Sequence, residues 1–300
     1  MSSITNGPSA VHAHLSARAR ELAAADPADL ARIRTIIDAL AIDSKPLAGV
    51  KFVQSAHAAI RGVWAVPENA DPDRRIVYCH GCSFMAGSLD LYSGVVSRLA
   101  VLARACVFFV EYRLAPEHRF PCAADDCLRA FHWARTNGPD GEGRAAACFL
   151  VGDSSGAALT IAIALDAARA GASPDGIVTL SPFVDLSVSG DANDGRDPLT
   201  TREMAMACAS IYAPGMDPRD PRLSPLFADL SALAPIQIHG ATQDPLLDDA
   251  LRLAKRARKA GARVELHVWS DVPHAWYLFP TELPEASLGL ELAATFLRRL

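Results

Sequence analysis

The sequence lacks the segments that mark membrane and secreted proteins. None of its apolar runs approaches the roughly 20 residues of a membrane span, and residues 1–13 hold no apolar core of a secretory leader. A basic block, an internal repeat and a low-complexity stretch are also missing, and the net charge is −5. These absences argue against nucleic-acid and membrane partners. We therefore expect a soluble cytoplasmic protein.

The sequence also lacks the cysteine pattern of a disulfide framework or a metal site. It has seven cysteines, an odd number, and Cys79, Cys106 and Cys148 each lie in an apolar, strand-like run. Such positions are typical of reduced, buried thiols. Residues 79–82 read C-x-x-C, but no second cysteine or histidine pair accompanies them at metal-binding spacing. We predict no metal and no organic cofactor.

The chain has enough apolar residues to form one large hydrophobic core. Half of the 300 residues are hydrophobic, which fits one large domain or one domain with a lid. After a loose tail over 1–13, periodicity favours helices at 14–25 and 27–40, the second signalled by Asp26-Pro27. Strands are then expected at 51–54, 59–66 and 75–79, the first two antiparallel, with a turn at 71–73.

The rest of the chain alternates between strands and helices. Strands are expected at 105–110, 147–151, 176–180, 235–239 and 264–269, and helices at 91–104, 122–137, 155–170, 246–259 and 282–300. This alternation predicts an α/β fold, in which a mostly parallel, twisted sheet of about eight strands has helices on both faces. Residues 187–226, with one helix at 200–212, are too long for a plain connection, so we interpret them as a lid insertion.

The stretch around Ser154 has the strongest local meaning. Gly152, Ser154 and Gly156 form G-x-S-x-G between a predicted strand and a predicted helix. A very tight strand-to-helix turn holds its central serine in a strained conformation, and flanking glycines let neighbouring backbone approach. The helix N-terminus then favours negative charge near that serine. A G-x-S-x-G match is short enough to occur by chance in a chain of this length. The interpretation therefore depends on whether an acid and a histidine accompany the serine.

The partners follow other strands of the predicted sheet. Catalytic groups gather at the carboxyl ends of parallel strands, and Asp244 and His274 follow strands 235–239 and 264–269. The order Ser154, Asp244, His274 is the one that hydrolases with this type of sheet use. A serine hydroxyl needs a base such as histidine to become a nucleophile, and the carboxylate orients that base.

Some alternatives remain open at this point. Asp244 precedes Pro245 and a helix, so it could serve only as a helix cap. Asp248 is a rival acid one turn further on, and Asp271 lies close to His274 in sequence. His80 and His118 also follow strands, but histidines in such loops more often bond to the backbone.

Four motifs in order resemble one known family. Residues 112–118 (YRLAPEH), 152–156 (GDSSG), 244–248 (DPLLD) and 273–274 (PH) are similar to the signatures of hormone-sensitive-lipase-like, or bacterial family IV, carboxylesterases of the α/β-hydrolase fold. The likeness covers about residues 50–300. It implies a catalytic domain over 50–186 and 227–300, with a two-part cap from residues 1–49 and the insertion 187–226.

The resemblance also implies the chemistry. Ser154, Asp244 and His274 would form the catalytic triad, and the backbone N–H groups of Cys82, Ser83 and Ser155 the oxyanion hole. Five motif residues would support them, namely His80, Gly81, Gly152, Asp153 and Gly156. The expected substrate is an ester with a short- to medium-chain acyl group. A lactone hydrolase or an acyltransferase would use the same residues, whereas a non-catalytic receptor on this fold would lack part of the triad. A homodimer is possible by the same likeness.

The sequence departs from this family at one place. The family has three glycines after the histidine, where this chain has Gly81-Cys82-Ser83. We expect the two side chains to narrow the space beside the scissile carbonyl and to disfavour esters of tertiary alcohols. Cys82 also places a thiol at the predicted pocket wall, which predicts inhibition by thiol reagents. Ala157, which replaces a further family glycine, should affect helix packing more than chemistry.

Overall fold

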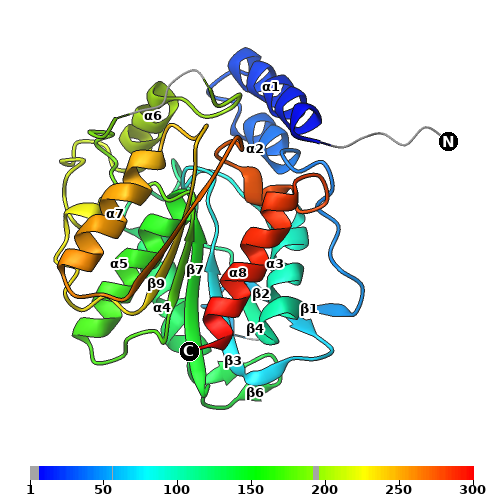
Figure 1. The fold of residues 1–300 in the computed structure, drawn as a ribbon, viewed down its shortest axis with the longest axis vertical. Coiled ribbons are helices and arrows are strands. Elements are labelled where there is room, and N and C mark those ends of the chain that lie inside the picture. Colours follow the sequence, from blue (N-terminus) through cyan, green and yellow to red (C-terminus); the bar gives the residue numbers. More distant parts are fainter. Residues whose placement is uncertain (1–6, 56, 192–195) are drawn as a thin grey trace.

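The central feature of the fold is one eight-stranded sheet between two layers of helices (Figure 1). The computed structural model describes residues 7–55, 57–191 and 196–300. In spatial order the strands are β1 (Val50–Gln54), β2 (Gly62–Pro67), β4 (Ala105–Val110), β3 (Asp71–Cys79), β7 (Ala147–Asp153), β8 (Ile177–Leu180), β9 (Ile236–Ala241) and β10 (Val264–Trp269). Strands β1 and β2 run antiparallel to their neighbours, and the others pair in parallel. The predicted fold class is confirmed.

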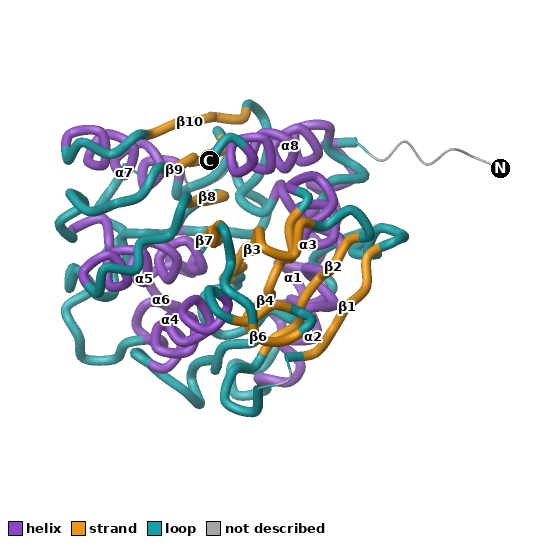
Figure 2. Tube along the Cα trace, turned by 90° about the horizontal axis from the view of Figure 1, so that it is seen from below, coloured by secondary structure: helices purple, strands orange, loops and turns teal. Residues whose placement is uncertain are grey.

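Helices cover both faces of the sheet. The helices of the described residues are α1 (Pro8–Ala24), α2 (Leu30–Asp38), α3 (Leu89–Ala103), α4 (Cys122–Ala134), α5 (Ser155–Arg169), α6 (Arg202–Tyr212), α7 (Leu247–Lys259) and α8 (Pro284–Arg298), of which α3, α4, α5, α7 and α8 lie on the faces. Helices α4, α5 and α7 share one hydrophobic cluster, while α3 and α8 share the other (Figure 2). Every residue of the central strands β4 and β7 is buried, as expected for apolar strands covered on both faces.

Three helices lie over the carboxyl edge of the parallel strands. Figure 1 shows α1, α2 and α6 together at this end of the molecule, although the first two precede the sheet and α6 lies between β8 and β9. Their side chains share a cavity with residues that follow β7 and β10. The division into cap segments 1–49 and 187–226 remains a prediction, and parts of both segments lie outside the described residues.

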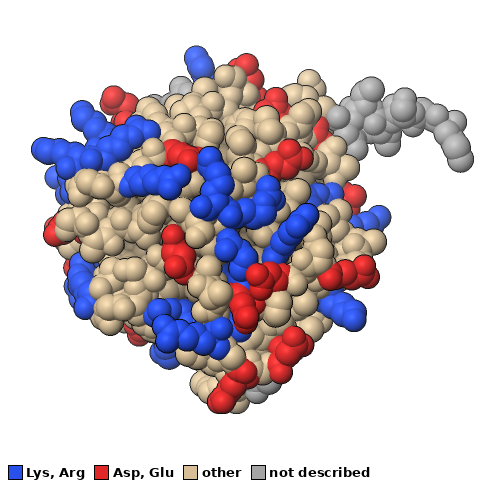
Figure 3. All heavy atoms as spheres, turned by 60° about the horizontal axis from the view of Figure 1, so that its bottom comes forward, with Lys and Arg blue, Asp and Glu red and all other residues tan. Residues whose placement is uncertain are grey.

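The opposite end of the sheet carries charges of both signs. Figure 3 shows basic side chains across the middle of this face, with acidic ones between and around them. Arg74, where β3 begins to pair with β7, donates from its guanidinium to the Leu297 carbonyl at 2.7 Å, and Arg299 pairs with Glu265 of β10 at 3.0 Å. These charged side chains therefore tie the amino ends of two strands to the C-terminal segment.

Several element boundaries differ from the predictions. The tail prediction is wrong from Pro8, where α1 already begins, and residues 1–6 lie outside the described part. Helix α2 starts at Leu30 because the Asp29 carboxylate accepts the Arg32 amide at 2.9 Å and caps the helix there. Residues 71–73 belong to β3 instead of a turn, since Asp71 pairs with β4.

Two smaller boundary predictions are also wrong. Strand β2 begins at Gly62 instead of residue 59, because residues 57–60 form a turn in which the Ile60 amide donates to the His57 carbonyl. Helix α4 ends at Ala134, and the chain then forms a short hairpin, β5 (Asn137–Gly138) and β6 (Gly141–Glu142), which the sequence did not indicate. None of these differences touches the candidate site.

Candidate active site

Ser154 lies at the tight turn between β7 and α5. Its φ of 49° and ψ of −123° are unusual for a residue with a side chain, as the motif predicts. The flanking glycines are required sterically. A Cβ on Gly156 would overlap the Cys79 carbonyl oxygen, and one on Gly152 would overlap the Thr160 hydroxyl. Small residues at both positions therefore allow the turn to place Ser154 at the carboxyl edge of the sheet.

The structure brings Ser154, His274 and Asp244 into one chain of contacts. His274 Nε2 lies 2.8 Å from Ser154 Oγ, and His274 Nδ1 lies 2.8 Å from Asp244 Oδ2. All three residues are buried, with 8%, 7% and 0% of the surface of Ser154, His274 and Asp244 exposed. When Nδ1–H donates to the carboxylate, Nε2 is free to accept the serine proton. The arrangement fits an activated nucleophile.

The charges around His274 favour its protonated form. Burial lowers the pKa of this imidazole, but the charge and hydrogen bond of Asp244 oppose burial, and Asp197 and Asp153 add further negative charge. The net effect raises the pKa of His274 above its ordinary value. The surroundings therefore stabilise the imidazolium that forms when the histidine takes a proton.

The rival acids lie elsewhere. Asp248 pairs with Arg252 at 2.5 Å, one helical turn away on α7. Asp271 is exposed, and its backbone amide donates to the Thr242 hydroxyl at 2.9 Å. Asp244 also accepts the Leu246 amide at 2.8 Å, but Leu246 itself is the N-cap residue of α7, so Asp244 is not the cap of this helix.

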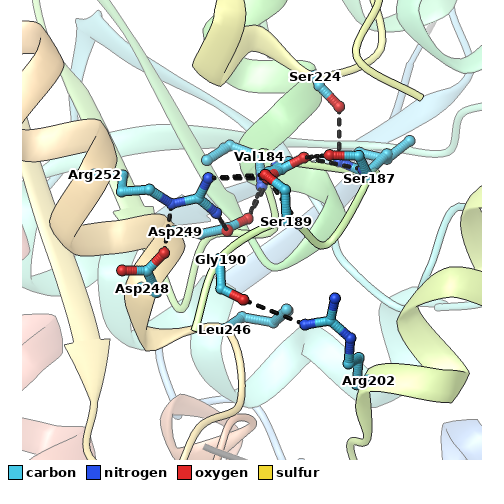
Figure 4. Close-up of polar contacts among 12 residues, drawn as sticks. Val184, Ser187, Ser189, Gly190, Arg202, Ser224, Leu246, Asp248, Asp249 and Arg252 are labelled. Atoms are coloured by element: carbon cyan, nitrogen blue, oxygen red, sulfur yellow. Dashed lines mark hydrogen bonds and ion pairs between the residues drawn. The ribbon is translucent and has the colours of Figure 1, made fainter. Parts of the chain in front are cut away.

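A second cluster of polar side chains fixes the start of the insertion that carries α6. Figure 4 shows the Arg252 guanidinium facing the carboxylates of Asp248 and Asp249, and it also pairs with Asp185 at 2.9 Å. Asp249 accepts the backbone amides of Val184 and Asp185 at 2.8 and 2.9 Å. These contacts, which we call the Arg252 cluster, hold the segment after β8 against α7.

The loop after β3 has an unusual backbone. Cys82, Ser83 and Phe84 have φ values of 64°, 61° and 62°, so three consecutive non-glycine residues adopt the left-handed conformation. The Phe84 amide donates to Ser155 Oγ at 3.2 Å, which ties the loop to the start of α5. Within the described part of the chain, the amides of Cys82, Ser83 and Ser155 have no protein acceptor. They are thus available to a ligand at the turn.

Asp153 connects three loops of the site. Its buried carboxylate accepts the hydroxyls of Tyr78, Tyr92 and Tyr277 at 2.9, 2.8 and 2.8 Å, and the Gly81 amide at 3.2 Å. Burial raises the pKa of Asp153 to about 6, against the opposing effect of the tyrosine hydrogen bonds. This residue therefore links the turn at Ser154, the loop after β3 and the segment after His274.

These tyrosines were not among the site residues predicted from the sequence, although the sequence contains a signal for them. The chain has only five tyrosines. Three bind Asp153, Tyr112 donates to the His80 carbonyl at 2.8 Å, and Tyr212 of α6 stacks on Phe84 at 3.8 Å between ring centroids. Tyrosine is rare in this chain, and its occurrence close to the site motifs is a signal that these side chains belong to the site.

His80 fits a structural role. Its ring stacks on Tyr112 with a centroid distance of 4.1 Å, and burial lowers its pKa to about 4. It is therefore neutral near pH 7, and its Nδ1 lies 3.1 Å from the Gly81 carbonyl oxygen. His80 and Gly81 thus help to shape the loop that presents the free amides.

Cys82 does lie at a cavity wall, but its thiol is not activated. Its sulfur is 3.6 Å from the Tyr92 hydroxyl. Burial and, next, the charge of Asp153 raise the pKa of the Cys82 thiol well above its ordinary value. Because the thiolate is the reactive form, we expect slow reaction with thiol reagents despite the position at the wall.

An apolar cavity of about 200 Å³ opens onto Ser154 and His274. Leu22, Ile33 and Ile37 contribute from the N-terminal helices, and Leu199, Met204 and Cys208 from the α6 segment. Further lining comes from Cys82, Ser83, Met85, Phe183 and Leu278. None of the described lining residues is Lys, Arg, Asp or Glu, so the cavity suits an uncharged ligand.

Two kinds of feature are absent from the described residues. Residues 7–55, 57–191 and 196–300 contain no group of three His, Cys, Asp or Glu side chains placed to hold a metal ion. In the same residues, no helix combines the length and apolar character needed to cross a membrane.

Comparison with solved structures places the whole chain in one group. An esterase from the bacterial hormone-sensitive lipase family superposes with a TM-score of 0.89 at 28% identity, covering 100% of this chain and 99% of that one. A hormone-sensitive lipase from a metagenome library gives a TM-score of 0.85 at 30% identity, covering 97% and 98%. Sheet, helices and cavity together therefore define an α/β-type hydrolase.

Sequence relatives agree with this class. An acetyl-hydrolase of Streptomyces hygroscopicus is 34% identical over 244 residues, which cover 78% of each chain. Carboxylesterase NlhH of Mycobacterium tuberculosis (strain ATCC 25618 / H37Rv) is 34% identical over 229 residues, covering 73% of this chain and 72% of that one. The model of a family described as the alpha/beta hydrolase fold matches residues 76–278. The chain belongs to this family, in its hormone-sensitive-lipase-like group, and is a carboxylesterase.

Proposed function

We propose that this carboxylesterase hydrolyses short- to medium-chain acyl esters through an acyl-enzyme on Ser154. The observation that carries the proposal is the chain of two 2.8 Å contacts from Ser154 through His274 to Asp244. It supplies a nucleophile, a base and an orienting carboxylate in the order that serine hydrolases require.

The proposed reaction has two halves. Ser154 Oγ attacks the ester carbonyl carbon while His274 Nε2 takes the serine proton, and the tetrahedral oxyanion accepts hydrogen bonds from the free amides of Cys82, Ser83 and Ser155. When the intermediate collapses, the C–O bond to the alcohol breaks and His274 gives its proton to the leaving alkoxide. Water then attacks the acyl-enzyme carbonyl while His274 Nε2 takes its proton, and when the bond between the acyl carbon and Ser154 Oγ breaks, His274 returns the proton to Oγ and the acid leaves.

The proposed substrate range rests on the cavity. Its apolar lining and its volume of about 200 Å³ favour an uncharged acyl chain of short to medium length. The side chains of Cys82 and Ser83 stand where three glycines would leave more room. A tert-butyl ester should therefore turn over much more slowly than the matching ethyl ester, and equal rates would contradict this part of the proposal.

The decisive experiment measures hydrolysis of p-nitrophenyl esters from acetate to palmitate. We expect the wild type to prefer short and medium chains and Ser154→Ala to lose more than about 1000-fold in kcat/KM. Ser231→Ala, at an exposed position, serves as the matched control and should retain full activity. A folded Ser154→Ala variant with wild-type turnover would remove Ser154 from the mechanism.

Lactone hydrolysis and acyl transfer use the same three side chains. Product analysis with a lactone, or with an ester and added alcohol, separates these reactions from ester hydrolysis. A receptor without catalysis is disfavoured because the three side chains are present and in contact.

A further inference from the structure

Asp197 reaches the backbone of His274 from the insertion that carries α6. The His274 backbone amide donates to Asp197 Oδ2 at 2.5 Å. The other oxygen, Oδ1, accepts the amides of Leu199 and Thr200 at 2.9 and 2.6 Å. One carboxylate thus bridges the histidine loop and two residues that line the cavity.

The segment around Asp197 is held on its C-terminal side. Thr201 caps α6 by accepting the Met204 amide at 3.2 Å, and the Arg202 guanidinium donates to the Gly190 carbonyl at 3.2 Å (Figure 4). The Arg252 cluster fixes the start of the same insertion near Asp185. Asp197 is therefore presented to His274 by an anchored piece of chain.

The charge of Asp197 lies beside the catalytic base without a cationic partner. No lysine or arginine of the described chain pairs with it, whereas Asp244, Asp197 and Asp153 all place negative charge near the His274 imidazole. Burial raises the pKa of Asp197, and His274 opposes this effect. Such an arrangement stabilises a positive charge on the imidazole. It also lowers the stability of the fold, because the carboxylate loses water contacts when it is buried.

We propose that Asp197 is a positioning residue for the esterase reaction, which fixes the His274 loop to the insertion and supplies a second carboxylate to the imidazolium. The proposal rests on the proposed function of His274. It makes the catalytic base dependent on the docked insertion, because the same carboxylate orders Leu199 and Thr200 at the cavity.

The test compares Asp197→Asn with Asp271→Asn. Asp271 is a matched control, since it lies on the His274 loop but is exposed, and asparagine tolerates its φ of 59°. We expect Asp197→Asn to lower kcat about 10- to 100-fold, with a smaller change in KM, because the base is misplaced. The control should stay within about twofold of wild type.

The pH profile separates positioning from general damage. Loss of a negative charge lowers the pKa of His274, so the acid limb of kcat/KM in Asp197→Asn should move about one unit to lower pH. A folded Asp197→Asn protein with wild-type kcat and an unmoved acid limb would overturn the proposal. A retained activity in Ser154→Ala would instead overturn the proposed function, so the two failures are distinguishable.

A second measurement needs no variant. Hydrogen exchange of the His274 amide in the wild-type protein should be slow, because this N–H donates to a carboxylate that is largely enclosed. Exchange as fast as that of an exposed loop amide would contradict the contact and the proposal with it.

Discussion

Two groups of buried and half-buried carboxylates balance their negative charge in opposite ways. In the Arg252 cluster, one guanidinium pairs with Asp185, Asp248 and Asp249. Around His274, by contrast, Asp153, Asp197 and Asp244 have no lysine or arginine partner among the described residues, and hydroxyls, amides and the imidazole are their contacts.

The Arg252 cluster stabilises the fold, whereas the carboxylates around His274 favour a protonated catalytic base. Arg252 carries a permanent positive charge beside its three carboxylates, and this charge does not change when a substrate reacts at Ser154. The negative charge around His274 is balanced best when the imidazole is protonated, which is the state that the proposed mechanism requires during attack on the substrate. Buried charge without a permanent partner therefore marks the site. Changes at Asp244, Asp153 and Arg252 test this contrast, and a change at Cys82 tests the neighbouring loop.

The largest effect is expected for Asp244→Asn. The amide side chain keeps the size of the carboxylate but removes the charge and favours the wrong imidazole tautomer, and a comparable change in serine proteases costs about 10⁴-fold in kcat. Asp248→Asn, four residues away in the Arg252 cluster, is the control and should keep nearly full kcat. Steady-state kinetics on p-nitrophenyl butyrate measures kcat of both variants. Equal losses of kcat would contradict the proposed difference between the carboxylates around His274 and the Arg252 cluster.

Asp153→Asn should come next, with a loss of about 10- to 100-fold in kcat/KM, because the amide keeps only one acceptor oxygen, and the Gly81 amide and the Tyr277 hydroxyl donate to different oxygens of Asp153. Asp166→Asn, at an exposed position on α5, is the control. A fully active Asp153→Asn enzyme would show that the three loops hold their positions without this carboxylate.

The same variant predicts a pH dependence of stability. The folded-state pKa of Asp153, about 6, lies above its ordinary value of 3.8, so its stabilising proton is lost as the pH rises through 6. Relative to Asp153→Asn, the wild type should lose about 3 kcal/mol of unfolding free energy between about pH 4 and 7. Urea unfolding at several pH values measures this difference, and a constant difference would refute the burial argument.

Arg252→Met should act on stability and hardly on chemistry. Removal of the guanidinium leaves buried carboxylates unpaired, which costs about 3 kcal/mol of unfolding free energy. Activity per folded molecule should fall less than about threefold at 25 °C, since no residue of the Arg252 cluster contacts Ser154 or His274. Thermal unfolding beside active-site titration checks both parts, and a large loss of kcat with normal stability would contradict them.

The smallest effect is expected for Cys82→Gly. Glycine removes the strain of φ 64° and should add up to about 1 kcal/mol of stability. It should also raise the ratio of tert-butyl to ethyl ester turnover by opening space beside the carbonyl. Arg104→Gly, with a φ of 53° at the end of α3, is the control that shares the strain relief but leaves the ratio unchanged.

The sequence predicted the fold and the candidate triad because both depend on local patterns. Alternating periodicity placed the strands, and the turn around Ser154 has a signature within five residues. Asp197 and the Arg252 cluster escaped prediction because their contacts join residues 77 and 67 positions apart, and a lone aspartate in a loop has no local signature. The start of α2 at Leu30 depends on the single capping side chain of Asp29, and hydrophobic periodicity does not locate such a cap.

The left-handed turn at residues 82–84 also bears on how such enzymes diverge. Its hydrogen-bond donors belong to the main chain, and their direction depends on φ instead of on the side chains. Substitutions at Cys82 and Ser83 can therefore change which alcohols fit while the donors are inherited unchanged. Under the proposed function, alcohol preference and oxyanion binding are therefore separable traits of one short loop.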